Sequence, residues 1–379
     1  MRALAVVSRS SLLIAALAAI GAAGGFGPSW AEDSASVLVS FDESQFPEGL
    51  AVAPDGTIYV GIANTGDIVE VDPSGSTATL ASIPLPEGGV LLGLEEHAGS
   101  IYALVSAGPE SGVHVISRRT GSVGQVATLP ADSFPNDLVF GDRGQIYVSD
   151  TLGGRILEVQ PFGEVRTWFA SPLIQGNVAD PGPLGIPIGA NGIAWAPDRK
   201  SLYVAVTEGA RVVEIPVDAD GSAGAADVVA EAPSLGGADG IVFGPDGTLY
   251  VTSFVQNHVV AIDIDTGSIE VVLSGDSYHA PATAAFSPNF ETLYITNFDG
   301  LVLFGLAPGP PITELLAVDS ASLSETVSPA ITPPSTGSAG LAASTSSSGK
   351  AVFAKAAVLS LLSLALFGSA HRALSISRQ

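Results

Sequence analysis

Four polar residues stand at the same position of a pattern that recurs along the chain. Each begins a short apolar segment that passes through a turn, often Pro-Asp-Gly, and ends at a tyrosine. They are Glu48, Asn136, Asn191 and Asp239, and the other two repeats carry Leu91 and Ala282 there. Carboxylate and amide oxygens are ligands that a hard cation such as Ca²⁺ prefers, and Ca²⁺ takes about six to eight of them. If the fold brings the four residues to one point, they supply four oxygen ligands, and water or substrate completes the shell.

The repeats also predict the scaffold that would bring these residues together. Six tyrosines, spaced by forty-odd residues with one longer interval, end the segments: Tyr59, Tyr102, Tyr147, Tyr203, Tyr250 and Tyr294. A period in this range, with several short strands in each unit, is typical of propeller blades. We therefore predict an all-β fold, a six-bladed β-propeller of four-stranded blades, over residues 36–316. The inner strands of a propeller line its central channel, so the four polar residues would face one another.

The two ends of the predicted domain complement each other. The sixth repeat stops after its predicted third strand, Leu301–Phe304, while an unassigned strand at Ser36–Phe41 precedes the first repeat. We expect this N-terminal strand to complete the last blade, because closing the ring removes two exposed sheet edges. A Gly- and Pro-rich loop over residues 176–190 precedes the fourth inner strand, and we expect it to overhang the channel mouth.

Composition limits the classes of partner. The chain has 38 acidic and 14 basic residues and a net charge of −24. This charge argues against nucleic acid as a partner, because the phosphate backbone would be repelled. It suits an exported protein or one that holds cations, although solubility alone could account for it. The chain has no cysteine and only five histidines, which disfavours zinc and copper.

The terminal segments predict export. Residues 1–31 combine early arginines with an apolar core and resemble a signal peptide. Residues 317–350 are rich in Ser, Thr, Pro and Gly and predict a disordered linker. The apolar tail at 351–370 could be a membrane span, the removable tail of a lipid anchor, or an amphipathic segment. We expect an extracellular or cell-surface protein, with possible membrane attachment through this tail.

The polar ring also has a second interpretation. Glu-Gly, Asn-Gly and Asp-Gly are common turn dipeptides, so the four residues could serve turns that precede the strands. The sequence alone leaves both interpretations open.

The ordered motifs resemble a known family. They are Pro47-Glu48-Gly49, Pro135-Asn136-Asp137, Ala190-Asn191-Gly192-Ile193-Ala194-Trp195-Ala196-Pro197-Asp198 and Ala238-Asp239-Gly240. In order and spacing this set resembles the regucalcin/gluconolactonase family of six-bladed propellers, with diisopropylfluorophosphatase and paraoxonase as more distant relatives. The resemblance covers residues 36–308.

The resemblance implies a catalytic metal site. Glu48, Asn136, Asn191 and Asp239 would bind one divalent cation, Ca²⁺ or another, and Asp239 would act as general base or nucleophile. His279, just before the sixth inner strand, could line the pocket. Ala190 and Ala238 stand where many members have Pro or Ser, and few basic residues are available for an acidic sugar.

The sequence alone is compatible with three functions. The first is an exported, monomeric, Ca²⁺-dependent hydrolase of lactones or related esters, acting on a small molecule. The second is a non-catalytic NHL-like propeller that binds protein or peptide ligands through its rim loops. The third is a strictosidine-synthase-like propeller with a different site. Fold analogy does not choose among them.

Overall fold

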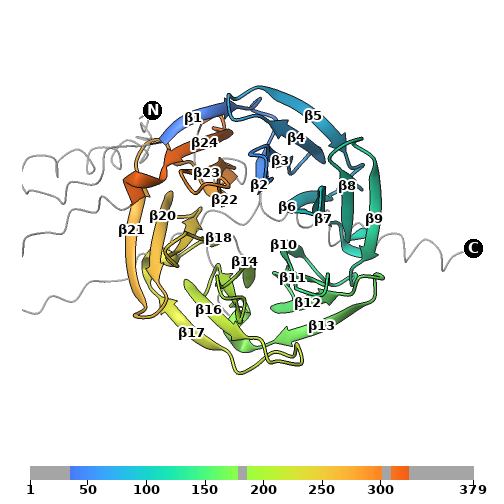
Figure 1. The fold of residues 1–379 in the computed structure, drawn as a ribbon, viewed down its shortest axis with the longest axis vertical. Helices are drawn as coiled ribbons and strands as arrows, with labels where there is room; N and C mark the ends of the chain where they lie inside the picture. The colour runs from blue at the N-terminus through green and yellow to red at the C-terminus, as the bar shows by residue number, and fades with distance from the viewer. Residues whose placement is uncertain (1–34, 178–185, 301–308, 324–379) are drawn as a thin grey trace, which may run out of the picture.

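The ring of blades is the dominant feature of the computed structural model, which describes residues 35–177, 186–300 and 309–323. Six antiparallel sheets of four strands stand around a central axis, as Figure 1 shows. The prediction of an all-β, six-bladed propeller is confirmed.

Each blade runs from an inner strand at the axis to an outer strand at the rim (Figure 1). The first blade holds β2 (Pro47–Val52), β3 (Ile58–Ile62), β4 (Asp67–Val71) and β5 (Thr77–Ser82). The second holds β6 (Val90–His97), β7 (Ser100–Ser106), β8 (Gly112–Ser117) and β9 (Val123–Thr128). The third holds β10 (Pro135–Phe140), β11 (Ile146–Asp150), β12 (Arg155–Val159) and β13 (Val165–Ala170). The fourth holds β14 (Ala190–Trp195), β15 (Ser201–Val206), β16 (Arg211–Pro216) and β17 (Asp227–Glu231). The fifth holds β18 (Ala238–Phe243), β19 (Leu249–Ser253), β20 (His258–Asp263) and β21 (Ser268–Ser274). The sixth holds β22 (Pro281–Phe286), β23 (Thr292–Asn297), β24 (Glu314–Asp319) and β1 (Ala35–Ser40).

The hairpin that joins the first two strands of a blade depends on its turn residues. Asp55 Oδ1 accepts a hydrogen bond from Thr57 N at 3.1 Å, and Gly56 has a φ of 87°. Asp246 and Gly247 repeat the arrangement in the fifth blade. Aspartate bonds back to the backbone two residues on, and glycine accepts the left-handed conformation without steric cost. These turns fix where each inner strand ends.

The core lies between neighbouring blades. The middle strands are almost wholly buried, as in β3 and β15, where every residue is buried. Apolar side chains on the two faces of each sheet pack against the next sheet and form six clusters around the ring. Burial of apolar surface on both faces of every blade therefore holds the inner strands around the axis.

The N-terminal strand closes the ring, as predicted. β1 pairs with β24, the third strand of the sixth blade, in antiparallel register from Ala35 opposite Val318 to Ser40 opposite Glu314. The prediction for that third strand was wrong, because β24 spans Glu314–Asp319 rather than Leu301–Phe304. The predicted domain boundary after residue 316 therefore falls inside β24, and η5 (Ser320–Leu323) follows it.

Several predicted segments lie outside the described residues. These are the signal peptide at 1–31, the apolar tail at 351–370, the linker beyond 323, and 178–185 within the predicted overhanging loop. Among the residues that the structure does describe, no helix is long and apolar enough to cross a membrane.

Candidate metal and active site

The four predicted ligands occupy equivalent places in the structure. Each is the second residue of its inner strand, within an irregularity of the pairing with the next strand. In the first blade Pro47 pairs with Ile62 and Leu50 with Val60, so Glu48 and Gly49 lie in a bulge between the two pairs. A bulge re-aims side chains that a regular strand would direct between the sheets. The same device therefore presents all four residues at one end of the inner strands.

The register corrects the assignment in the second blade. Leu91 pairs with Val105 just as Pro47 pairs with Ile62, so Leu92 rather than Leu91 is the counterpart of Glu48. The hairpin between β6 and β7 is one residue shorter than that between β2 and β3, so aligning the repeats on their tyrosines placed the second blade one residue out of register. The counterpart is a leucine either way, so this blade offers no oxygen ligand from a side chain.

The glycine after each of three ligands serves close packing between blades. A Cβ on Gly49 would lie 2.2 Å from Leu92 O, and one on Gly192 would lie 2.2 Å from Asp239 O. Both glycines lie inside strands and have no positive φ. The alternative interpretation, that the Glu-Gly, Asn-Gly and Asp-Gly pairs form turns, is therefore wrong, because these pairs lie inside strands. They let neighbouring inner strands approach closely where the ligands sit.

Threonine hydroxyls link one blade to the ligand segment of the next. Thr207 Oγ1 donates to Ala238 O at 2.8 Å, directly before Asp239. Thr296 Oγ1 donates to Glu48 O at 2.9 Å, which joins the sixth blade to the first. Thr151 Oγ1 donates in the same way to Ala190 O at 2.7 Å. These bonds fix the relative positions of inner strands that are distant in sequence.

Two buried oxygen atoms at the site have no hydrogen-bond partner among the described residues. They are Oε2 of Glu48 and Oδ1 of Asn191. Asn191 is held by its other end, because its Nδ2 donates to Thr207 Oγ1 at 2.9 Å. Buried polar atoms rarely stay unpaired, since each costs about 1–3 kcal/mol. Both atoms belong to predicted metal ligands, and a bound cation would satisfy them.

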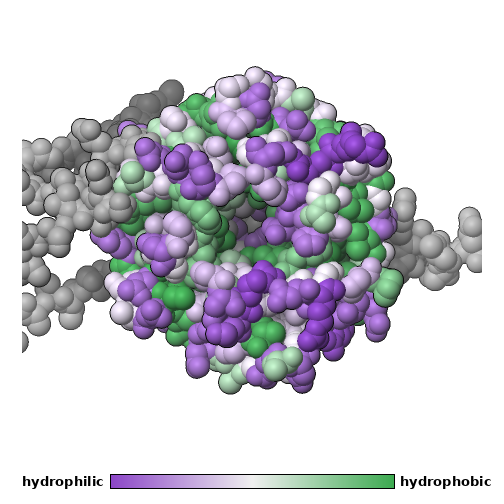
Figure 2. All heavy atoms as spheres, viewed as in Figure 1, coloured by the Kyte–Doolittle hydropathy of each residue, from purple (hydrophilic) through white to green (hydrophobic). Residues whose placement is uncertain are grey.

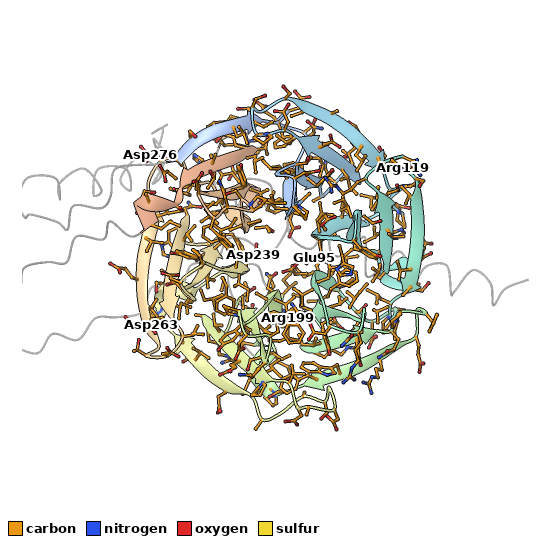
Figure 3. The ribbon with its side chains drawn as sticks, viewed as in Figure 1. Glu95, Arg119, Arg199, Asp239, Asp263 and Asp276 are labelled. Carbon is orange, nitrogen blue, oxygen red and sulfur yellow. The ribbon has the colours of Figure 1, made fainter. Side chains whose placement is uncertain are left out.

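The site concentrates negative charge. Burial raises the pKa of Glu48 well above its ordinary value, and the nearby carboxylates of Asp239 and Asp137 raise it further. Burial and Asp137 likewise raise the pKa of Asp239, against a hydrogen bond from the Asn191 side chain that lowers it. Three neighbouring carboxyl groups, buried in Glu48 and half-buried in Asp137 and Asp239, favour binding of protons or of a cation. Figure 3 shows Asp239 near the axis of the ring.

Asp137 is a site residue that the sequence analysis did not single out. It stands in β10 where the other ligand-bearing strands have glycine, so it offers a carboxylate in place of a close contact. Its Oδ2 accepts from Ile193 N of the fourth blade at 3.0 Å and its Oδ1 accepts from Leu138 N at 2.8 Å. Burial raises its pKa to about 6 despite these bonds. The sequence did offer a signal for Asp137, because an aspartate follows Asn136 whereas a glycine follows each of the other three predicted ligands.

The donor set suits a hard cation. All side-chain donors are carboxylate or amide oxygens, and two of them are buried and unpartnered. No three His, Cys, Asp or Glu side chains in the described part of the chain form a group that could hold a metal ion. A cation here would therefore depend on the two asparagines as well as on Glu48 and Asp239. A charge interaction links Glu48 to Asp239 and a hydrogen bond links Asn191 to Asp239, whereas Asn136 is placed only by its equivalent strand position.

A cavity of about 710 Å³ occupies the channel between Asp137 and the hairpin turns, on the side away from the four predicted ligands. Residues of all six inner strands line it, from Asp137 to the hairpin turns, and Figure 2 shows the hollow at the centre of the ring. None of the four predicted ligands lines this cavity. His279 is half-buried outside it, and its backbone N–H donates to Asn297 Oδ1 at 3.1 Å. The channel thus has a ligand end and a hairpin end with Asp137 between them.

Family comparison agrees with this architecture. A family model described as "SMP-30/Gluconolactonase/LRE-like region" matches residues 87–299, more than half of the chain. The chain therefore belongs to this family. The match includes Asn136, Asn191 and Asp239, while Glu48 lies before it. A model for the N-terminal part of strictosidine synthase-like proteins matches residues 34–71. No curated protein matches the chain significantly.

Solved structures share the fold at low identity. Regucalcin from Agrobacterium tumefaciens, described as a calcium-binding protein, is 21% identical with a TM-score of 0.55, covering 76% of this chain and 94% of its own. A gluconolactonase from Xanthomonas campestris is 17% identical with a TM-score of 0.55, covering 75% and 89%. Virginiamycin B lyase from Staphylococcus aureus is 18% identical with a TM-score of 0.52, covering 75% and 88%. Because these propellers differ in chemistry, function must be argued from the site.

Proposed function

We propose that the protein is a hydrolase of lactones or related esters that depends on a divalent cation, Ca²⁺ in the first instance. The observation that carries the proposal is the pair of buried, unpartnered oxygens of Glu48 and Asn191 beside Asp239. Membership of a family that includes gluconolactonase supports the substrate class. The calcium-binding description of the regucalcin structure supports the choice of ion.

In this proposal Glu48, Asn136, Asn191 and Asp239 hold the cation. When bound, the cation polarises the carbonyl oxygen of the lactone or ester. Asp239 accepts a proton from the attacking water, or attacks the carbonyl carbon itself. Asn191 orients Asp239 through the hydrogen bond between their side chains, and Thr207 holds Asn191.

The test is turnover of a lactone panel. We expect hydrolysis by the purified protein, loss of hydrolysis on treatment with a chelator, and recovery when Ca²⁺ is restored. Asp239→Asn keeps the size of the side chain but removes its basicity, so we expect kcat to fall by about 10²–10⁴-fold.

Two results bear against this function. If the protein folds, binds Ca²⁺ and hydrolyses no lactone or ester, a binding propeller of the NHL type becomes the better account. If Asp239→Asn hydrolyses lactones as fast as the native protein, Asp239 is not the base or nucleophile. Circular dichroism of both proteins establishes that each is folded.

The proposal extends to the setting of the protein. The signal-peptide pattern of residues 1–31 supports export to the cell surface or medium, and the apolar tail at 351–370 supports membrane attachment. We expect a monomer that acts on a small molecule, with no nucleic-acid partner. Cell fractionation with an antibody tests this: protein found only in the cytosol would contradict export.

A further inference from the structure

The first cleft between blades, at the hairpin end of the ring, is filled by a single arginine. Arg118 follows β8 of the second blade and reaches back to the first. Its Nε donates to Tyr59 Oη at 2.8 Å, and its Nη2 lies 2.8 and 2.7 Å from the two carboxylate oxygens of Asp55. Its guanidinium also lies over the Tyr59 ring, with Cζ 5.3 Å from the ring centroid. A guanidinium in this cleft therefore binds the aspartate of the hairpin turn and the tyrosine of the neighbouring blade.

The cleft between the fourth and fifth blades repeats the receiving side of this arrangement. Tyr203 pairs with Glu214 across the strands just as Tyr59 pairs with Glu70. Asp198 also takes the place of Asp55, because its Oδ1 accepts from Lys200 N at 3.0 Å within the same kind of turn. Aspartate, tyrosine and glutamate therefore recur together, although the sequences between them differ.

The arginine itself does not recur. Arg118 lies three residues after Val115, which pairs with Tyr102 of its own blade. In the fifth blade Ala261 pairs with Tyr250, and three residues later the chain has Ile264. In the cleft between the fourth and fifth blades, the residue at the position of Arg118 is therefore Ile264, which is shorter and carries no charge.

The structure has a cavity of about 490 Å³ where the guanidinium would lie. Its lining contains Tyr203 and Ile264 and the following carboxylates: Asp198, Glu214, Asp246, Asp263 and Asp265. In the described part of the chain, the one ion pair of these carboxylates joins Asp198 to Lys200, whose side chain is 80% exposed. Figure 3 places Asp263 at the periphery of the ring, away from Asp239 near its axis. The cavity is thus separate from the candidate metal site.

We propose that the cleft between the fourth and fifth blades binds a guanidinium group on an aliphatic stem, as in arginine. Asp55 and Tyr59, the equivalents of Asp198 and Tyr203, already bind one in the first cleft, so the claim rests on the internal repeat as well as on the acidic lining. A planar guanidinium can donate to a carboxylate with two parallel bonds while it stacks on a tyrosine ring, whereas an ammonium cannot. This binding site goes beyond the proposed hydrolase function and does not depend on it.

Calorimetric titration of the purified protein with N-acetyl-L-arginine amide tests the proposal, because blocking both ends leaves only the guanidinium charged. We expect saturable binding with one site per chain, at least tenfold tighter than that of N-acetyl-L-lysine amide. Methylguanidinium, which lacks the stem, measures how much of the affinity comes from the head group.

Ile264→Arg is the decisive variant, with Ile264→Leu as its matched control. The new arginine should occupy the cleft as Arg118 occupies the first one, so we expect arginine binding to disappear and the melting temperature to rise. Ile264→Leu should bind as the native protein does. Asp198→Asn should weaken binding at least fivefold.

The reciprocal variant opens the first cleft. In Arg118→Ala we expect the number of arginine sites per chain to rise from one to two. If this variant does not fold, Ile264→Arg still decides the matter. Equal affinity for the arginine and lysine compounds, or unchanged arginine binding by folded Ile264→Arg, would overturn the proposal.

Discussion

Glu95 is an acid at a channel position where the other blades carry alanine or valine. It pairs with Tyr102, and the residues that pair with the equivalent tyrosines are Ala51, Val139, Ala194, Val242 and Ala285. It lines the 710 Å³ cavity at the hairpin end of the channel, close to the axis (Figure 3). Burial raises its pKa to about 8, helped by the carboxylates of Asp137 and Glu96 and opposed by Arg199. Glu95 therefore holds its proton at neutral pH.

This proton makes stability depend on pH. The pKa of Glu95 is about 8 in the folded protein against 4.5 for the ordinary side chain. The unfolded chain releases the proton first, so the free energy of unfolding should fall as the pH rises from 4.5 to 8. The slope is at most about 1.4 kcal/mol per pH unit. Glu95→Gln cannot ionise, so urea denaturation at pH 5, 6.5 and 8 should show its advantage over the native protein growing with pH. Parallel stability curves would contradict the assignment.

At the residue scale, the sequence predicted the site residues at a position that is polar in several blades, and it missed those that occur in one blade only. Glu48, Asn191 and Asp239 were found because the same position is polar in several blades. Asp137 was missed because it occurs once, at a position where four blades have glycine and the sixth has Thr283. Glu95 was missed because the other blades have alanine or valine at its position. Only the structure shows that both lie in the channel, where burial raises their pKa values.

At the scale of elements, the site depends on a bulge, a glycine and a hydroxyl. The bulge directs the ligand side chain out of the regular sheet, as between Ala190 and Ile193. The glycine, here Gly192, lets the next inner strand approach. The hydroxyl of Thr207 then joins the two strands. A change at any of the three should move the ligands without touching them directly.

Gly192→Ala tests the close approach. The added Cβ would lie 2.2 Å from Asp239 O, so the neighbouring inner strand must shift. We expect a loss of about 1–3 kcal/mol in the free energy of unfolding, together with weaker cation binding. Gly124→Ala is the control, because its Cβ would meet only Val115 Cγ1 at an ordinary 3.5 Å. Urea denaturation of both should separate them, and equal stability would contradict the packing argument.

Thr207→Val tests the hydroxyl link. Valine keeps the shape but removes the hydrogen bonds that the hydroxyl makes with Asn191 Nδ2 and Ala238 O. Because both groups are buried, we expect a loss of about 1–3 kcal/mol in stability. Thermal or urea unfolding measures it. A change below about 0.5 kcal/mol, typical of surface substitutions, would mean that the link does not hold the strands.

At the scale of the whole molecule, ring closure joins the two ends of the domain. β1 covers the edge of β24, and Leu315 of β24 is fully buried in the cluster between the sixth and first blades. Thr296 crosses the same seam to Glu48 at the ligand end. Closure therefore supports the position of Glu48 as well as the stability of the ring.

Truncation at β1 should open this seam. Removal of residues 1–41 exposes the edge of β24, and an unpaired edge favours aggregation. We expect a lower melting temperature and higher-order species in size-exclusion chromatography. The control begins at residue 35 and keeps β1 intact. Equal melting of the two proteins would show that β1 does not close the ring.

The sequence predicted the ring and its closure from the period of the tyrosines and from counting strands. It placed the third strand of the sixth blade wrongly because Leu301–Phe304 is apolar and follows the tyrosine strand at the usual distance. The true strand, β24, lies after a longer connection and pairs with both β23 and β1. That pairing depends on residues far apart in the chain, which a local pattern does not reveal.

Calcium titration of the purified protein, stripped with a chelator and followed by calorimetry, tests the central claim most directly. We expect one Ca²⁺ per chain, and at least tenfold weaker binding by Glu48→Gln and by Asp239→Asn, which keep the size of each side chain. No saturable binding, or equal affinity in these variants and the native protein, would contradict a cation site at Glu48, Asn136, Asn191 and Asp239.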